Sequence, residues 1–189
     1  MAASQRARML RAMTVAVAAK GYAGTVVADV VSGAGVSRQS FYEQFADKQE
    51  CFLAAYEASA EGILAGVEEG VDREGDGLGQ LRGMVQAYLG FLASEPAVAR
   101  TYLIDVFAAG PEAFRRQGEV SARFAGLLAR VHDRLRNEGR SDRELDAFDF
   151  EALVGAVRSI VTARVLAGDG ADLPELLDRI ERFLLESLA

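Results

Sequence analysis

Hydrophobic positions recur along this chain at spacings of three and four residues, a pattern typical of helices with one apolar face. In the first such segment Leu10, Met13 and Val17 fall on the same side. The alternation of polar and apolar residues that indicates strands is not found in the sequence. The sequence therefore predicts an all-α fold of about nine helices.

Helix breakers and capping residues set the expected boundaries. Pro96, Pro111 and Pro174 stand where helices can begin, because proline is tolerated in a first turn. Asp47 and Glu50 have the spacing of a capping box at the start of another helix. The predicted helices cover residues 5–20, 26–34, 38–44, 48–69, 78–93, 97–108, 112–137 and 149–167, and a last segment after Asp172 and Pro174.

The segment 21–53 is the most informative part of the sequence. Its two short predicted helices are separated by Gly35, Val36 and Ser37, a combination typical of a helix-turn-helix. Glycine permits the tight turn, and Ser37 is expected to cap the helix that follows. Thr25 is the expected cap of the helix before the turn.

The second of these helices has two faces of different chemistry. Phe41 and Phe45 are one turn apart and can face a core, which leaves Arg38, Gln39 and Tyr42 on another face. Arginine and glutamine side chains can form paired hydrogen bonds with base edges, whereas hydroxyl groups and lysine bind phosphates. The pattern therefore favours a DNA-binding face.

With these residues in place, the sequence resembles the TetR (tetracycline-repressor-like) family of bacterial transcription regulators. The resemblance spans about 45 residues from the first helix, and the rest of the chain matches in architecture only. Val31, Gly33 and Gln44 depart from the family pattern. The matching residues are Gly21, Tyr22, Thr25, Val30, Ala34, Gly35, Val36, Ser37, Phe41, Tyr42, Phe45, Asp47, Lys48 and Leu53.

The resemblance implies specific roles for residues around the turn. Thr25, Ser37, Tyr42 and Lys48 would hold the phosphate backbone, and Arg38, Gln39 and Ser40 would read bases. Four of these residues also have simpler interpretations, and for Arg38 and Gln39 this is a place on the surface without a role in binding. Tyr42 could pack beside Phe41, and Lys48 could be a solvated residue of a first helical turn.

The resemblance also implies a domain organisation. Residues 1–47 would form a three-helix DNA-binding domain, and residues 48–189 a larger helical domain for effector binding and dimerisation. The expected dimer interface, on the last two helices, comprises Phe150, Val154, Val157, Val161, Leu176, Ile180, Phe183 and Leu184. The expected effector pocket comprises Met84, Tyr88, Phe91, Tyr102, Val106, Phe107, Phe124, Leu128 and Arg158.

Burial within one chain is the competing interpretation for both sets of residues. Two charged residues in apolar surroundings, Asp105 and Arg158, could pair with each other, bind an effector or face solvent. The only histidine, His132, stands among charged residues and is expected at the surface.

Charge is unevenly distributed along the 189 residues. The whole chain has a net charge of −7, which by itself argues against binding to DNA. The first 50 residues, however, have six basic and four acidic side chains, and the remainder has 15 basic and 24 acidic ones. A basic end on an acidic body favours a nucleic-acid contact at that end.

Composition excludes several classes of site. A single cysteine, Cys51, rules out an internal disulfide and fits a cytoplasmic location, and one Cys with one His cannot fill a zinc site. The longest uncharged run, 83–94, is too short to span a membrane. The apolar stretch 12–19 has the outline of a signal peptide, but it is short and contains Thr14.

The sequence thus predicts a homodimeric regulator, most simply a repressor released from a pseudo-palindromic DNA operator by a small, largely apolar effector. No catalytic, metal or cofactor motif is found. The glycine-rich segment Gly75–Gly79, for example, lacks the spacing of a dinucleotide-binding fingerprint. The competing interpretation is a helical ligand-binding or scaffold protein without a DNA function.

Overall fold

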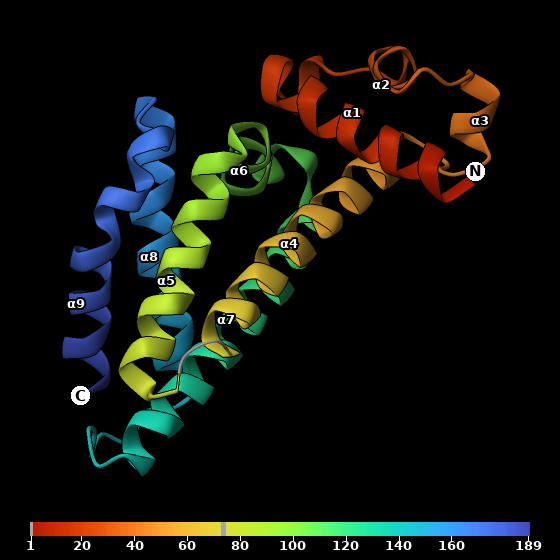
Figure 1. Cartoon of the computed structure of the whole chain (residues 1–189). Helices are drawn as coiled ribbons and strands as arrows, with labels where there is room; N and C mark the ends of the chain where they lie inside the picture. Colours follow the sequence, from red (N-terminus) through yellow and green to blue (C-terminus); the bar gives the residue numbers. More distant parts are fainter. Residues whose placement is uncertain (1, 73–74) are drawn as a thin grey trace. The chain divides into compact units, whose positions relative to one another are not determined.

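The computed structural model describes residues 2–72 and 75–189, and every regular element in these ranges is helical (Figure 1). The predicted all-α fold is confirmed. The elements are α1 (Ala2–Gly24), α2 (Val27–Ala34), α3 (Arg38–Tyr42), α4 (Lys48–Asp72), α5 (Gly77–Ser94), α6 (Pro96–Leu103), η1 (Asp105–Ala109), α7 (Pro111–Asn137), α8 (Ala147–Ala167), η2 (Gly170–Leu176) and α9 (Leu177–Leu188).

Two segments differ in detail from the predicted helices. The segment 97–108 is divided into α6 and the 3₁₀-helix η1, which begins after Ile104. Pro174 lies inside the 3₁₀-helix η2, and α9 begins only at Leu177. A proline removes an N–H donor from the helix, and η2 accommodates it before regular α-helix begins.

The helices form two compact units. The first combines residues 1–61 with 97–117, and the second combines 62–96 with 118–189. Helices α4 and α7 therefore contribute one part to each unit. The predicted boundary after residue 47 lies inside the first unit, because α4, α6 and η1 contribute to the same compact body as the first three helices.

The first unit is built around α1. This helix packs against α2 and η1, and α2 in turn packs against α3. Met9, Met13 and Val17 are fully buried on the inner face of α1. Gly21 interrupts α1 with a φ of 72°, so the predicted stop of the first helix at this glycine is present as a kink.

The second unit is a bundle in which α5 packs against η2 and α9, and η2 also packs against α8. The inner face of α9 contributes Ile180, Leu184 and Leu188, all buried. At the other side of α5, α4 approaches closely at a pair of glycines. A Cβ atom on Gly70 would lie 2.6 Å from the carbonyl oxygen of Gly83, so only glycine fits there.

His132 is buried in the second unit, and its predicted surface position is wrong. Only 2% of the residue is exposed, because its ring packs near Phe150 with the ring centroids 5.6 Å apart. Nε2 of His132 lies 3.3 Å from the hydroxyl of Ser141, which donates a hydrogen bond to the carbonyl of Leu188 at the end of α9. Burial, with the charge of Arg136, lowers the pKa of His132.

We predict that Gly70→Ala lowers the free energy of unfolding by about 1–3 kcal/mol, because the added methyl group meets the backbone of α5. Gly66→Ala is the matched control on the same helix, since no atom lies within 4 Å of the added Cβ. It should raise stability by up to about 1 kcal/mol through helix propensity. Urea denaturation distinguishes the two, and equal effects would contradict the close approach.

Candidate nucleic-acid interface

The turn between α2 and α3 has the backbone that the sequence predicts. Gly35 adopts a left-handed conformation with φ 62° and ψ 46°, and its N–H bonds back to the carbonyls of Val31 and Ser32. Ser37 is extended, and its hydroxyl oxygen accepts a hydrogen bond of 3.0 Å from the N–H of Ser40. The predicted cap by Ser37 is thus confirmed, and α3 begins at a fixed position.

Two buried phenylalanines hold α3 against the rest of the first unit. Phe41 and Phe45 are 0% and 1% exposed, and their ring centroids are 5.5 Å apart. Arg6 from α1 lies over the Phe45 ring at 4.5 Å from its centroid, and it donates a hydrogen bond of 3.4 Å to the carbonyl of Gln44. Sequence reasoning missed this role of Arg6.

The opposite face of α3 is open to solvent. Arg38 and Gln39 are exposed, and Tyr42 is 55% exposed with its ring edge-on to Phe41. Gln39 donates a hydrogen bond of 3.1 Å to Glu43, which orients its amide along the helix. Three side chains with the chemistry of base and phosphate recognition therefore share one exposed surface.

Lys48 is held in place at the start of α4. Its Nζ donates a hydrogen bond of 2.9 Å to the carbonyl of Tyr22 and lies 4.2 Å from the centroid of the Tyr22 ring. Burial and the charge of Asp47 raise the pKa of Tyr22. The lysine thus ties α4 to the end of α1, and its two remaining N–H donors can still serve a phosphate.

Thr25 has a structural role in place of the predicted capping and phosphate contacts. It has no exposed surface, and its hydroxyl donates a hydrogen bond of 2.9 Å to the carbonyl of Gly21. The residue that precedes α2 is Val26, whose N–H donates to the carboxylate of Asp29 at 3.0 Å. Thr25 therefore stabilises the kink at Gly21 within α1, and its buried side chain is not available to DNA.

Asp29 is a second residue that sequence reasoning missed. Besides accepting from Val26, its carboxylate pairs with Lys20 near the end of α1, and both hydrogen bonds lower the pKa of Asp29. The signal in the sequence is that Asp29 is the first acidic residue after a run of basic ones. The pair fixes α2 against α1.

The predicted effector residues are divided between the two units. In the second unit Met84, Phe124 and Leu128 are buried, and Tyr88 is edge-on to Phe124 with centroids 5.8 Å apart; Phe91 and Arg158 are half-buried. In the first unit Tyr102 and Val106 are buried, and Phe107 is 49% exposed. Their common role in a pocket stays a prediction.

The two charges in apolar surroundings have partners of their own. Asp105 is buried and forms an ion pair with Arg100, with Nε and Oδ2 3.6 Å apart. Burial raises the pKa of the Asp105 carboxyl, and Arg100 opposes this rise. Arg158 donates a hydrogen bond of 3.2 Å to the hydroxyl of Ser121. Neither Arg100 nor Ser121 was predicted from the sequence as a partner of these charges.

The predicted dimer residues differ in exposure. Val154 and Val157 are half-buried, and Phe183 is 37% exposed. The core of the chain itself buries Phe150, Val161, Leu176, Ile180 and Leu184. The exposed apolar residues that sequence reasoning missed are Phe148, Ile160 and Leu166.

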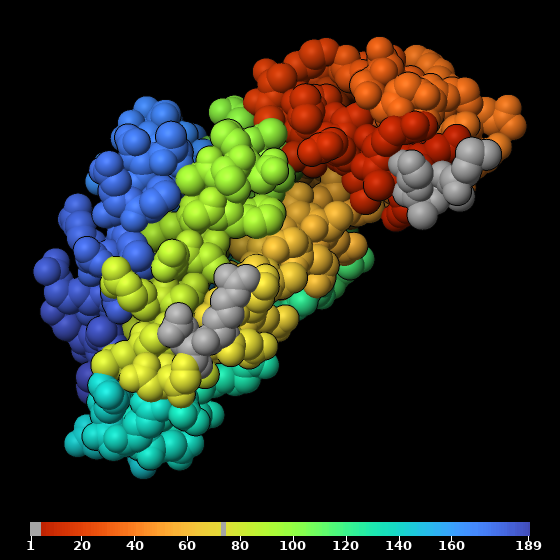
Figure 2. Space-filling model, viewed as in Figure 1, coloured from red at the N-terminus to blue at the C-terminus, as the bar shows by residue number. Residues whose placement is uncertain are grey.

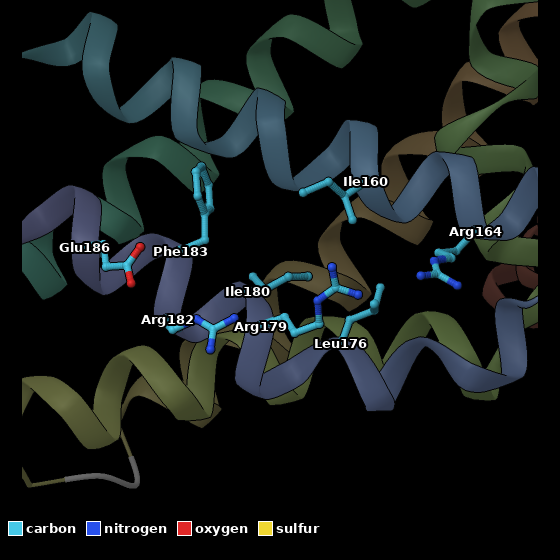
Figure 3. Close-up of a pocket in the computed structure, with 8 residues that line it drawn as sticks. All are labelled: Ile160, Arg164, Leu176, Arg179, Ile180, Arg182, Phe183 and Glu186. Carbon is cyan, nitrogen blue, oxygen red and sulfur yellow. The ribbon is translucent and has the colours of Figure 1, made fainter.

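A groove separates the exposed sides of α8 and α9 (Figure 3). Ile160 from α8 and Phe183 from α9 point toward the space between the two helices. Its volume is about 330 Å³, and its lining residues are Ile160, Arg164, Leu176, Arg179, Ile180, Arg182, Phe183 and Glu186.

Among residues 2–72 and 75–189, no helix is both long and apolar enough to cross a membrane. Within the same ranges, no three His, Cys, Asp or Glu side chains gather in a group that could hold a metal ion.

Comparison with known proteins finds similarity in the N-terminal region. Residues 10–55 match the family model described as bacterial regulatory proteins, tetR family. An uncharacterized HTH-type transcriptional regulator of Bacillus subtilis, YezE, is 31% identical over 85 residues, which cover 45% of this chain and 44% of YezE. The HTH-type transcriptional activator FasR of Mycolicibacterium smegmatis is 26% identical over 47% of this chain and 40% of its own. The match thus spans less than half of each curated relative.

Solved structures extend the likeness of fold to the whole chain. The fatty acid degradation regulator FadR from Bacillus halodurans has a TM-score of 0.87 at 19% identity, over 96% of this chain and 94% of its own. FadR from Bacillus subtilis, solved in complex with stearoyl-CoA, has a TM-score of 0.86 at 17% identity, over 96% of this chain and 98% of its own. At these identities the likeness establishes the fold.

We predict that Thr25→Val lowers the free energy of unfolding by about 1–2 kcal/mol, because the buried hydrogen bond to Gly21 is lost. The affinity of the folded variant for DNA should not change. Thr25→Ser, which keeps the hydroxyl, is the control. Chemical denaturation and a DNA titration at a temperature where all three proteins are folded provide the test, and lost affinity without lost stability would contradict the structural role.

Proposed function

We propose that this chain, whose N-terminal domain belongs to the TetR family of bacterial regulatory proteins, is a transcriptional regulator that binds duplex DNA as a homodimer. The observation that carries the proposal is the exposed face of α3. Arg38, Gln39 and Tyr42 lie on one side of a short helix whose other side is buried. Arg38 and Gln39 read base edges in the major groove, and Ser37, Tyr42 and Lys48 hold phosphates. Ser40, which is half-buried beside Ser37, is a further candidate for base contact.

The small size of the DNA-contacting surface on α3 is the reason for proposing a homodimer. Five residues of α3 contact only a few base pairs, which is too little for strong specificity. A two-fold dimer doubles the contact and reads two half-sites about one helical turn, ~34–36 Å, apart on a pseudo-palindromic operator. The exposed apolar side chains of α8 and α9, among them Phe183, support these helices as the interface.

We further propose that the regulator is a repressor and that its effector has a long acyl chain. Support comes from the two FadR structures, one of which holds stearoyl-CoA, and from the apolar character of the candidate pocket residues. The effector acts by a population shift: it binds more tightly to a dimer in which the two α3 helices do not match the spacing of the operator. Its effect on DNA affinity equals its preference for that state.

DNA binding is tested with a duplex enriched from a random library by the purified chain. We expect Arg38→Ala to raise the dissociation constant for this duplex by about 30-fold or more, because one bidentate base contact of about 1–3 kcal/mol is lost in each of the two half-sites. Arg136→Ala, at an exposed arginine of the acidic second unit, should leave it unchanged. The affinity of the unmodified protein should also fall steeply with salt. An unchanged affinity of Arg38→Ala would contradict the proposed reading role.

The effector is tested with stearoyl-CoA, against coenzyme A and stearate as separate controls. We expect stearoyl-CoA to raise the apparent dissociation constant for DNA by about 5- to 150-fold, the usual range of allosteric coupling. Because the chain has no tryptophan, Tyr88→Trp provides a fluorescence reporter in the candidate pocket. Phe114→Trp, at a residue 62% exposed in the first unit, is its control. Unchanged DNA affinity and fluorescence with all three compounds would contradict an acyl effector.

A further inference from the structure

Gln39 is held by a neighbour on the exposed face of α3. Its amide nitrogen donates a hydrogen bond of 3.1 Å to Oε1 of Glu43, which lies one helical turn further along the chain. The backbone joins the same two residues, because the N–H of Glu43 donates to the carbonyl of Gln39 at 3.0 Å. Both side chains are exposed, and the orange surface of α2 and α3 is uncovered on the face shown in Figure 2.

The contact decides which atoms of Gln39 remain for a base. A carboxylate only accepts hydrogen bonds, so the amide turns its NH₂ group toward Glu43. Adenine presents an acceptor at N7 and a donor at N6, and it pairs with the carbonyl oxygen of a glutamine and with the N–H on the same side of the amide. The other N–H can stay with Glu43 during this pairing. The bond to Glu43 and a bidentate pair with adenine can therefore exist together.

Guanine makes a different demand on the same amide. It presents two acceptors in the major groove, N7 and O6, so a glutamine that binds both must turn its NH₂ group to the base. In this chain Glu43 holds that group. Guanine therefore competes with Glu43 for the amide of Gln39, whereas adenine does not.

The charge of Glu43 is poorly suited to its place. The residue is the C-cap of α3, and negative charge is unfavourable at the C-terminal end of a helix. It also adds negative charge to the face that we propose approaches phosphates. Within residues 2–72 and 75–189, Glu43 forms no ion pair, and its carboxylate bonds to Gln39. The contribution left for this carboxylate is its hold on Gln39.

We propose that Glu43 is a specificity-determining residue of the DNA-binding face, which positions the Gln39 amide for adenine and against guanine. The proposal rests on the DNA-binding function proposed above, and it names one base of each half-site. Water leaves this face when it enters a groove, and the hydrogen bond between Gln39 and Glu43 is then stronger than in the free protein. The carboxylate also repels the phosphates of every sequence alike. Glu43 thus lowers the affinity for all DNA while it raises the preference for adenine.

Two substitutions separate the charge of Glu43 from its hydrogen bond. Glu43→Gln removes the charge and keeps an acceptor for the Gln39 amide, whereas Glu43→Ala removes both. The duplex enriched from a random library is compared with duplexes in which one base pair is changed in both half-sites. Gln39→Ala identifies the base pair that Gln39 contacts, because the preference at that pair is lost in this variant.

At that base pair we expect the unmodified chain to prefer adenine to guanine. Glu43→Ala should lower this preference about fivefold or more, because a side chain that must be ordered on binding costs about twofold or more in each of the two half-sites. Glu43→Gln should keep most of the preference. Both variants should bind a random duplex about twofold more tightly, because each lacks the charge that repels phosphate.

A double-variant cycle checks that Glu43 acts through Gln39. The variant Gln39→Ala, Glu43→Ala should have the same preference at this base pair as Gln39→Ala alone. The free energy of unfolding of Glu43→Ala, measured in urea, should not fall, because the substitution removes a negative charge from the C-terminal end of α3.

Four results would overturn the positioning role. They are an unchanged preference in Glu43→Ala, an equal loss in Glu43→Gln, a preference of the unmodified chain for guanine at this base pair, and no effect of Gln39→Ala at any base pair. A loss of preference at every base pair together with lost stability would also overturn it, since Glu43 would then support the fold of α3.

Arg38→Ala separates a failure of this proposal from a failure of the proposed function. If Arg38→Ala weakens binding to the enriched duplex while the Glu43 variants give one of these contrary results, the role of Glu43 is wrong and DNA binding through α3 stands. If no duplex is enriched, or if Arg38→Ala binds as tightly as the unmodified chain, the proposed reading of DNA by α3 is itself contradicted, and the role of Glu43 with it.

Discussion

The five residues of α3 are too few to form a stable helix by their own hydrogen bonds, because nucleation of an isolated helix is costly. The helix exists because Phe41 and Phe45 are buried behind it and Ser37 caps it. The same contacts fix the direction of its exposed side chains. The base recognition that we propose for Arg38 and Gln39 therefore depends on the apolar contact between α3 and the rest of the first unit.

The shortness of α3 is also the reason for proposing a homodimer. One such helix offers a small contact area for DNA, and the homodimer that we propose through α8 and α9 would double it. The net charge also differs between the N-terminal part of the chain and the remainder. The first 50 residues have a net charge of +2 and the remainder −9, so in the proposed complex phosphate would repel the acidic body and attract the basic end.

The order of the helices and the cap by Ser37 could be predicted from the sequence, because proline, glycine and capping residues act locally. The burial of Phe41 and Phe45 was predictable for the same reason, from their one-turn spacing. The role of Thr25 was not, since its hydroxyl bonds to a carbonyl that only the kink at Gly21 brings near. His132 was also misplaced, because its cover comes from Phe150 and the end of α9, both distant along the chain.

In the function that we propose, two copies of α3 bind DNA together. Selection of duplexes from a random library, followed by sequencing of the enriched pool, tests it most directly. We expect an inverted repeat whose half-sites are about one helical turn, or a multiple of it, apart. A pool without enrichment, or one enriched in a single half-site without a repeat, would contradict it.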